Sequence, residues 1–555
     1  MPRIHRDTMA AMIRTIVAAV LFVPLTLTAD DFFVKTCQHN GDGTAPTCVD
    51  EDGAAGAWAA DPTFSNVPFG SGGGEVGPGD SLYLCGEIRG RLLTAQGGTE
   101  TERLRIDFDC PGDPGSISGL TVVDEFEGSG PWNTTDTFVT PWNLLRDGVP
   151  LRSGIYGSLS KDEWQWNKLN GGDQKVYLGF DPTGHTVEIS TINNAIQLDA
   201  GADFVDLISP RAYYINYGSS PIRIYSSNVR VFDPDIRYSR GGVDVRSTAH
   251  DVVVTNVNCI RVNACLDVNT DTPGAAGDDR PYNVEFIGGV IRGVVDDWKN
   301  LSSSFTYEIE LQILNGAAGA IDEECIGSTD AGDNIAFRQL DIGYCGSWFV
   351  ATLDESHRAV GYEVTDNVVH HVGRGIMTAN SGFACFDDVD ISRNRFFEVG
   401  DPLVNEHVLA TGGDGSGCDL AFNDNYIDRA VQGLLVQQGA NADYNRNVFT
   451  KMTSRGAGFP SYFVLFANAN GDISGDNNTY FGNVAGAFSG RWRWKGQAAT
   501  TTFSVFQSQA APVDANSSLA ATPRDLSQPR STNAARSVSE ARPAASSRSQ
   551  AQRAP

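Results

Sequence analysis

The stretch from Gly241 to Tyr480 repeats one pattern, a short apolar strand that ends in asparagine: Val253-Val-Thr-Asn256-Val, Val364-Thr-Asp-Asn367-Val, Ile391-Ser-Arg-Asn394-Arg-Phe, Phe422-Asn-Asp-Asn425-Tyr-Ile, Tyr444-Asn-Arg-Asn447-Val-Phe and Ile473-Ser-Gly-Asp-Asn-Asn478-Thr-Tyr. From Asn367 onward the asparagine returns every 22 to 31 residues. A period of this size is typical of repeat proteins whose units stack to share one core. Each unit is too short for a strand plus a crossover helix and is rich in β-branched and aromatic residues. The pattern predicts an all-β chain, a parallel β-helix in which one inward asparagine per coil forms an amide ladder.

Composition limits the partners. The formal net charge is −27, which argues against a nucleic-acid partner, because such a partner selects for a basic surface. Sixty glycines and a charged fraction of 20% fit a turn-rich β-protein.

The N-terminus has the features of an export signal. Arg3, His5, Arg6 and Arg14 precede the apolar run 16–27, which is closed by Thr28-Ala29. The run is shorter than the ~20 apolar residues of a membrane span, so it predicts a signal peptide over residues 1–29 rather than an anchor. We therefore expect a secreted protein, extracellular or periplasmic, without a membrane span.

The ten cysteines agree with export. An even count in an exported chain favours disulfides, and buried free thiols are the alternative. The cysteines fall into pairs close in sequence: Cys37/Cys48, Cys85/Cys110, Cys259/Cys265, Cys325/Cys345 and Cys385/Cys418.

The start of the mature chain carries a family resemblance. Phe32-Phe-Val is followed by Gly41-Asp-Gly-Thr and then by Pro78-Gly-Asp-Ser-Leu-Tyr-Leu-Cys-Gly86. This order resembles the opening of secreted right-handed β-helix proteins of the pectin-lyase-like superfamily. The resemblance implies a right-handed solenoid and a carbohydrate-active protein, with a cap and first coil over residues 30–118 and the main β-helix over residues 191–518.

Two segments interrupt or close the repeats. Residues 119–190 lack the period and contain Trp132, Trp142, Trp164 and Trp166, which predicts a small β-rich insertion. Its tryptophans either stack on sugar rings or form the core of the insertion. Near the other end, 491–495 (Arg-Trp-Arg-Trp-Lys) is either a cap on the last coil or a sugar-binding patch. Residues 503–518 resemble the last strand and turn of the superfamily, and 519–555 have the composition of a disordered tail.

A local column of acidic residues suggests the chemistry. Val243-Asp244-Val245-Arg246 and Leu266-Asp267-Val268-Asn269 align at a spacing of 23 residues. Because side chains alternate along a strand, the apolar residues point inward and the polar ones are expected to face solvent side by side. The following coil is expected to add Asp322 and Glu323, with Glu324 beside them.

Coil spacing makes this column a candidate active site. Neighbouring strands are about 4.8 Å apart, and glycosidases place two carboxyl groups about 5–5.5 Å or 6.5–9.5 Å apart. Stacked acids raise one another's pKa, so one stays protonated as the general acid. The predicted catalytic residues are Asp244, Asp267, Asp322, Glu323 and Arg246, with Asp244 and Asp267 as the leading pair. Residues predicted to bind substrate are Asn269, Arg261, Trp348, Asp354, His357 and Arg374. No cofactor is expected for a hydrolase.

Two alternatives stay open. In a polysaccharide lyase, Ca²⁺ held by the stacked carboxylates, with Asp271 as a further ligand, would bridge to a uronic acid. Arg246 or Arg261 would then be the base. The third reading is a non-catalytic carbohydrate-binding or adhesin-like β-helix. A separate set of histidines, in His357-Arg358, His370-His371 and Glu406-His407, either supplies a second polar patch or occupies surface turns.

Overall fold

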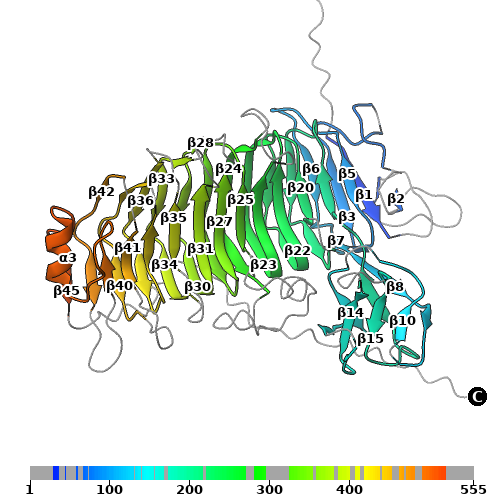
Figure 1. Cartoon of the computed structure of the whole chain (residues 1–555). Coiled ribbons are helices and arrows are strands. Elements are labelled where there is room, and N and C mark those ends of the chain that lie inside the picture. Colours follow the sequence, from blue (N-terminus) through cyan, green and yellow to red (C-terminus); the bar gives the residue numbers. More distant parts are fainter. Residues whose placement is uncertain are drawn as a thin grey trace, which may run out of the picture.

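The computed structural model describes residues 29–36, 44–45, 58–59, 67–72, 74–130, 132–138, 141–154, 157–167, 173–216, 220–270, 280–294, 324–353, 358–379, 385–400, 407–412, 418–437, 440–452, 462–467, 471–481 and 491–520. The chain is a parallel β-helix of the right-handed type that the sequence predicts, wound from one large sheet (Figure 1). No helix among these residues is long and apolar enough to cross a membrane.

Each coil contributes to three parallel ladders, which we call faces A, B and C. Face A contains β5 (Leu92–Thr94), β17 (Ile196–Leu198), β20 (Ile222–Ile224), β22 (Asp235–Arg246), β23 (His250–Asn269), β25 (Ile326–Thr329), β27 (Ser347–Leu353), β31 (Arg374–Ala379), β35 (Leu409–Gly412), β38 (Leu434–Val436), β41 (Tyr462–Phe466) and β44 (Arg491–Arg493).

Face B contains β1 (Asp31–Lys35), β3 (Ser81–Cys85), β6 (Leu104–Asp107), β18 (Val205–Ile208), β21 (Arg230–Phe232), β23, β24 (Tyr282–Arg292), β26 (Ile335–Gly343), β29 (Glu363–Thr365), β33 (Val389–Ser392), β36 (Cys418–Asn423), β39 (Ala440–Asp443) and β42 (Ile473–Ser474). The short β2 (Trp58–Ala59) pairs with β1. A separate pair of strands is β28 (Arg358–Val360) and β32 (Cys385–Asp387).

Face C contains β4 (Glu87–Ile88), β7 (Ser116–Ser118), β19 (Arg211–Tyr213), β22, β23, β24, β26, β30 (Val368–Val372), β34 (Arg395–Val399), β37 (Tyr426–Asp428), β40 (Val448–Thr450), β43 (Thr479–Phe481) and β45 (Ser518–Ala520). The long strands β22, β23, β24 and β26 bend around corners and so belong to more than one face.

The core follows from alternation along each strand. In β20, Ile222 and Ile224 are fully buried, and Arg223 between them points away from the core. Stacking repeats this arrangement, so one apolar cluster runs from the first coil to the C-terminal cap. Burial of this continuous apolar surface is the main stabilising contribution to the solenoid.

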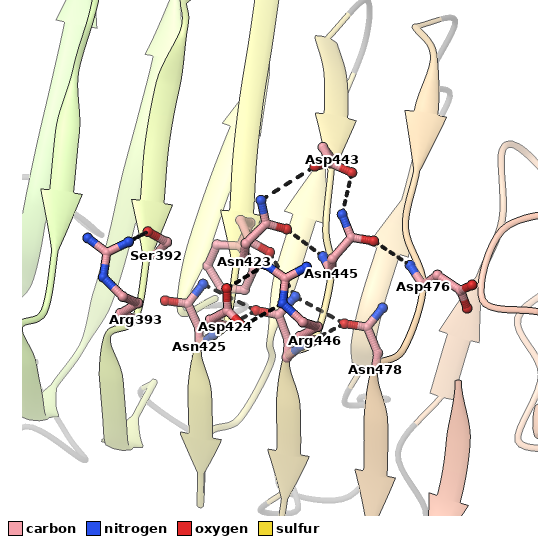
Figure 2. A network of polar contacts seen from close by, with 12 residues as sticks. Ser392, Arg393, Asn423, Asp424, Asn425, Asp443, Asn445, Arg446, Asp476 and Asn478 are labelled. Carbon is pink, nitrogen blue, oxygen red and sulfur yellow. Dashed lines mark hydrogen bonds and ion pairs between the residues drawn. The ribbon is translucent and has the colours of Figure 1, made fainter. Parts of the chain in front are cut away.

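The corner between faces B and C contains the predicted asparagine ladder. Its five members are all buried: Asn367, Asn394, Asn425, Asn447 and Asn478. From Asn394 onward, each Oδ1 accepts two hydrogen bonds from the ladder asparagine one coil earlier. One comes from the backbone N of that asparagine and the other from its Nδ2, at 2.9–3.2 Å. The residue before each one has a positive φ, which turns the chain from one face to the next. Figure 2 shows part of the ladder beside Arg446 and Asp424, which form an ion pair on the outer rim of the corner.

Asn256 does not belong to this ladder. It is exposed, has a φ of 55°, and donates from Nδ2 to Asp233 Oδ1 at 3.0 Å. In the earlier coils Val257, Gly289 and Leu340 occupy the register position that the asparagines take later. The ladder therefore covers only the later coils, and there the expectation of one inward asparagine per coil is confirmed.

The insertion emerges between β7 and β17, where the chain passes from face C to face A. It consists of two small sheets, one of β9 (Phe126–Glu127), β10 (Trp132–Thr134), β13 (Arg152–Ser153), β14 (Glu163–Trp166) and β15 (Val176–Leu178), the other of β8 (Leu120–Val123), β11 (Leu144–Arg146), β12 (Val149–Pro150) and β16 (Val187–Ser190). Trp142, Trp164 and Trp166 are buried in its own core, and Trp132 packs against that core. Of the two readings for these tryptophans, core formation is the correct one.

The C-terminal end is a cap. Trp492 in β44 is buried against Phe463, Tyr480 and the helix α3 (Phe503–Ala510). The expectation of a strand in this last segment is wrong for 503–510, because Phe503, Phe506 and Ala510 repeat at helical spacing and cover the last coil. Only 518–520 form a final strand. The 491–495 segment is therefore part of a cap on the last coil, which is one of its two predicted roles.

The disulfide prediction is confirmed wherever the structure describes the cysteines. Cys85–Cys110, Cys259–Cys265 and Cys325–Cys345 are bonded, and Cys418 is bonded as well. Among the described residues no cysteine is free, and Cys37 and Cys48 lie outside them.

Candidate functional site

Face A brings the predicted acidic column together. Five residues are successive partners in the strand register of this face, one each on β17, β20, β22, β23 and β25. They are Gln197, Arg223, Asp244, Asp267 and Gly327. Each polar residue in this column lies between two buried apolar residues of its strand, so the alternation predicted from the sequence is present. Asp244 and Asp267 are therefore direct neighbours on adjacent coils.

Asp244 does not face solvent as expected, because it is fully buried. Arg246 Nε lies 2.7 Å from both of its carboxylate oxygens, and Arg223 Nε lies 3.4 Å from Oδ2. A charge buried at this depth needs such partners. The two arginines neutralise Asp244 and hold it in place, which leaves no free edge of this carboxylate for a substrate.

Asp267 is the acid with an unusual protonation equilibrium. The residue is buried but not completely, with 8% of its surface exposed. Burial, together with the negative charges of Asp244 and Glu324, raises the pKa of Asp267 to about 7, against the opposing effect of Arg246 and Arg240. Asp267 is therefore largely protonated in mildly acidic solution and available as a proton donor.

Gly327, the strand partner of Asp267 on the next coil, leaves open space beside the carboxyl group of Asp267. A Cβ at Gly327 would lie 2.6 Å from Asp267 Oδ1 and 3.5 Å from Glu324 Cγ. A side chain at this position of the column would collide with the carboxyl group of Asp267, so the glycine leaves open space on the coil that follows Asp267. The side chains of Asp267 and Glu324 converge on the space that Gly327 leaves.

Glu324 begins a second column beside the first. It pairs with Ser347, which pairs with Arg374 on the next coil, and Arg374 Nε donates to Ser347 Oγ at 3.1 Å. Arg374, predicted to bind substrate, therefore lies on the same face as Glu324, two coils away. Asn269, also predicted, pairs with Arg246 and accepts a hydrogen bond from the backbone N of Thr329 at 3.1 Å.

Two predicted substrate-binding residues lie elsewhere. Trp348 is fully buried in the core, and its Nε1 donates to Val408 O at 2.8 Å, so the prediction that it contacts substrate is wrong. The register shifts between Ser347 and Phe349, and this irregularity accompanies the inward position of the ring. Arg261 lies at a corner with a φ of 56°, and its Nη2 lies 3.5 Å from Val294 O, outside the acidic column.

The remaining predicted site residues, Asp271, Asp322, Glu323, Asp354 and His357, lie outside the described part of the chain. Within the described part, no group of three or more histidine, cysteine, aspartate or glutamate side chains is arranged to hold a metal ion.

Sequence reasoning left Arg223 and Gln197 out of the site. Their signal was present, because Ile196-Gln-Leu and Ile222-Arg-Ile have the same apolar–polar–apolar form as Val243-Asp-Val and Leu266-Asp-Val. Glu324 was expected to lie beside Glu323, but it was not among the predicted catalytic residues. Glu324 differs from the acids next to it in sequence only because Gly327, the strand partner of Asp267, has no side chain and leaves space beside it.

Comparison with known proteins gives structural matches alone. No protein-family model and no curated protein matches the chain. Among solved structures, XylC in complex with xylose superposes with a TM-score of 0.44 at 11% identity, covering 84% of this chain and 86% of that one. The GH136 lacto-N-biosidase from Eubacterium ramulus gives 0.32 at 11%, with 81% and 67% covered, and the exopolygalacturonase from Thermotoga maritima gives 0.25 at 10%, with 75% and 80% covered. None of these similarities assigns a substrate or a reaction to this chain.

Proposed function

We propose that this β-helix is a secreted polysaccharide-degrading glycoside hydrolase whose catalytic pair is Asp267 and Glu324. The observation that carries the proposal is the acid with a pKa of about 7 beside other carboxylates on one wall of the solenoid. Glycosidases need one carboxylic acid and one carboxylate, and different environments for two acids separate these roles.

Asp267 is the general acid. It donates its proton to the glycosidic oxygen while the bond from that oxygen to the anomeric carbon breaks. Glu324 is the nucleophile, since its side chain keeps an accessible part and converges on the same space. Its carboxylate bonds to the anomeric carbon, and a water activated by the now ionised Asp267 then releases the sugar. The short separation expected of side chains on adjacent coils favours this retaining route, which needs about 5–5.5 Å, over inversion at about 6.5–9.5 Å.

Asp244, Arg246 and Arg223 act as positioning residues in this scheme. Asp244 contributes a negative charge behind Asp267 that raises the pKa of Asp267, and the arginines keep Asp244 fixed. Asn269 and Arg374 border the same face and are proposed to bind substrate hydroxyl groups. The net charge of −27 favours a neutral polysaccharide over a polyanionic one, because the overall field repels anions.

The test uses the purified full chain with neutral and uronate-containing polysaccharides, scored for new reducing ends. Asp267→Asn is expected to lower kcat by about 10²–10⁴-fold, the usual contribution of a positioned general acid. The control is Asp107→Asn, which changes a buried, arginine-paired aspartate on face B. Wild-type turnover in Asp267→Asn with an intact circular dichroism spectrum would remove this residue from the mechanism.

A second measurement tests the role of Glu324. In Glu324→Ala, added azide is expected to restore turnover and to yield a glycosyl azide, because a small anion occupies the space of the lost carboxylate. Rescue without a glycosyl azide, or hydrolysis by the wild-type protein that first releases the sugar with inverted anomeric configuration, would contradict a nucleophilic Glu324.

The alternatives have their own signatures. A lyase would release unsaturated, ultraviolet-absorbing products and lose activity in chelator. In that reaction Arg246 is a poor base, because its guanidinium is held by Asp244. Binding without any new reducing end across all substrates would instead indicate a non-catalytic carbohydrate-binding protein.

A further inference from the structure

Face C carries a pair of adjacent histidines that the proposed hydrolysis does not use. His370 and His371 are consecutive in β30, and His371 has a φ of 54°. This backbone conformation interrupts the normal alternation, so the two rings project to the same side. Their Nδ1 atoms face each other at 2.9 Å.

The opposite nitrogen of each ring meets a carboxylate. His370 Nε2 lies 3.0 Å from Asp341 Oδ1, and His371 Nε2 lies 3.0 Å from Glu398 Oε2. Arg292 lies 2.8 Å from Asp341 Oδ2.

The hydrogen bonds of the Nε2 atoms determine which atoms of the two rings face each other as acceptors. A carboxylate accepts hydrogen bonds and cannot donate, so each Nε2 must carry the proton. In a neutral imidazole with its proton on Nε2, Nδ1 presents a lone pair. The two Nδ1 atoms lie 2.9 Å apart, so a single positive species, a proton or a metal ion bound by both lone pairs, fits between the rings.

The distance identifies the geometry of a cation that would fit. Metal–nitrogen bonds to histidine are about 2.0–2.1 Å long, so two such bonds at a right angle place the nitrogens about 2.9 Å apart, whereas a tetrahedral angle places them about 3.3 Å apart. The observed separation matches the right angle. Right-angled nitrogen ligands are typical of tetragonal Cu²⁺ and Ni²⁺ rather than tetrahedral zinc.

The surroundings of the pair have the form of a metal centre. Histidines that bind metals usually donate their second N–H to a carboxylate, which fixes the ring and raises the basicity of the ligating nitrogen. Tyr344 also holds the rings, because it stacks on His371 at 5.3 Å and meets His370 edge-on at 5.7 Å. Asp341 in β26, the histidines in β30 and Glu398 in β34 come from three successive coils.

We infer that His370 and His371 form a surface site for a tetragonal divalent cation, Cu²⁺ or Ni²⁺, bound through both Nδ1 atoms with water in the other positions. The site lies on face C and is independent of the acids on face A. Such a cation would join the coils that contain Asp341, the two histidines and Glu398.

The experiment is a calorimetric titration of the chelator-treated full chain with Cu²⁺ and, separately, Ni²⁺. We expect binding that is weakened at least about 100-fold by His370→Gln or His371→Gln, and about 10–100-fold by Asp341→Asn, which removes a carboxylate partner of a ligand. His250→Gln is the matched control. His250 also has a carboxylate partner, Asp251 at 2.7 Å, and an aromatic neighbour, Tyr282, but no second imidazole from the described residues faces it.

Electron paramagnetic resonance of the Cu²⁺ complex supplies the second readout. Two equatorial nitrogen ligands, lost in both histidine variants and kept in His250→Gln, are the expected result. Absence of binding, or equal affinity in the wild type and both variants at an unchanged melting temperature, would overturn the inference and leave a proton as the species shared by the two rings.

Discussion

Asn425→Ala tests whether the amide ladder stabilises the solenoid. Asn425 lies in the middle of the ladder and is 1% exposed. Its Oδ1 accepts from the backbone N of Asn394 at 3.0 Å and from the Nδ2 of the same residue at 3.2 Å. Its Nδ2 donates to Ile391 O at 2.9 Å and to Asn447 Oδ1 at 3.2 Å. The substitution removes all four contacts.

The magnitude follows from the groups that remain. Asn447 Oδ1 keeps the bond from the backbone N of residue 425, at 3.0 Å, and so remains satisfied. The backbone N of Asn394 and the carbonyl of Ile391 lose a partner in a buried corner. Each unsatisfied buried group costs about 1–3 kcal/mol, so we expect a loss of about 2–6 kcal/mol in the free energy of unfolding.

Urea unfolding followed by circular dichroism measures this loss as a shift in the transition midpoint. The matched control is Asn441→Ala on face B. Its side chain also bridges coils, donating to Asp419 Oδ1 and accepting from the backbone N of Asp472, both at 2.7 Å, but these contacts are exposed to water. We expect the control to lose less than about 1 kcal/mol, because water replaces exposed partners. Equal losses in the two variants would refute the argument that burial gives the ladder its strength.

Three further predictions concern protonation, cross-linking and the cap. The raised pKa of Asp267 favours the native state below the unfolded value of 3.8, and this contribution is lost as the pH rises through about 7. Asp267→Asn should therefore flatten the fall in stability between pH 4 and pH 7 found by thermal unfolding, and an unchanged pH profile would contradict the assignment. Replacing Cys265 by Ser opens a short loop and should cost about 2 kcal/mol in urea unfolding, while an equal stability of both forms would show that the bond adds nothing. Trp492→Ala should cost about 3–5 kcal/mol through loss of packing over the last coil, and a shift no larger than that of the exposed Val505→Ala would argue against a capping role.

The sequence was informative wherever one physical constraint repeats. The asparagines from Asn367 to Asn478 and the alternating strands around Asp244 and Asp267 recur at coil spacing, so their stacking could be predicted from the residues. The tryptophans of the insertion were ambiguous, since a flat apolar ring suits either a sugar or a core, and only their burial decides.

Other structural features occur only once in the chain, so a repeating sequence pattern could not predict them. The irregular register at Ser347 and Phe349 accompanies an inward Trp348, and the burial of Asp244 depends on two arginines, one of them 21 residues earlier in the chain. The cap helix at Phe503–Ala510 belongs to no repeat, so the family pattern gave the wrong element there.

An acid that ionises inside a stacked column lowers the stability of the native state, and the nearby covalent bonds offset this loss. Ionising Asp267 places a second negative charge against Asp244, which works against folding above neutral pH. Two of the disulfides end next to this column: Cys265 precedes Asp267 by two residues, and Cys325 precedes Gly327 by two. Cross-links that restrict the unfolded chain stabilise the native state at every pH, including the range where Asp267 loses its proton. The corners that present the acids are thus held independently of the charge state of Asp267, which the proposed catalysis would change.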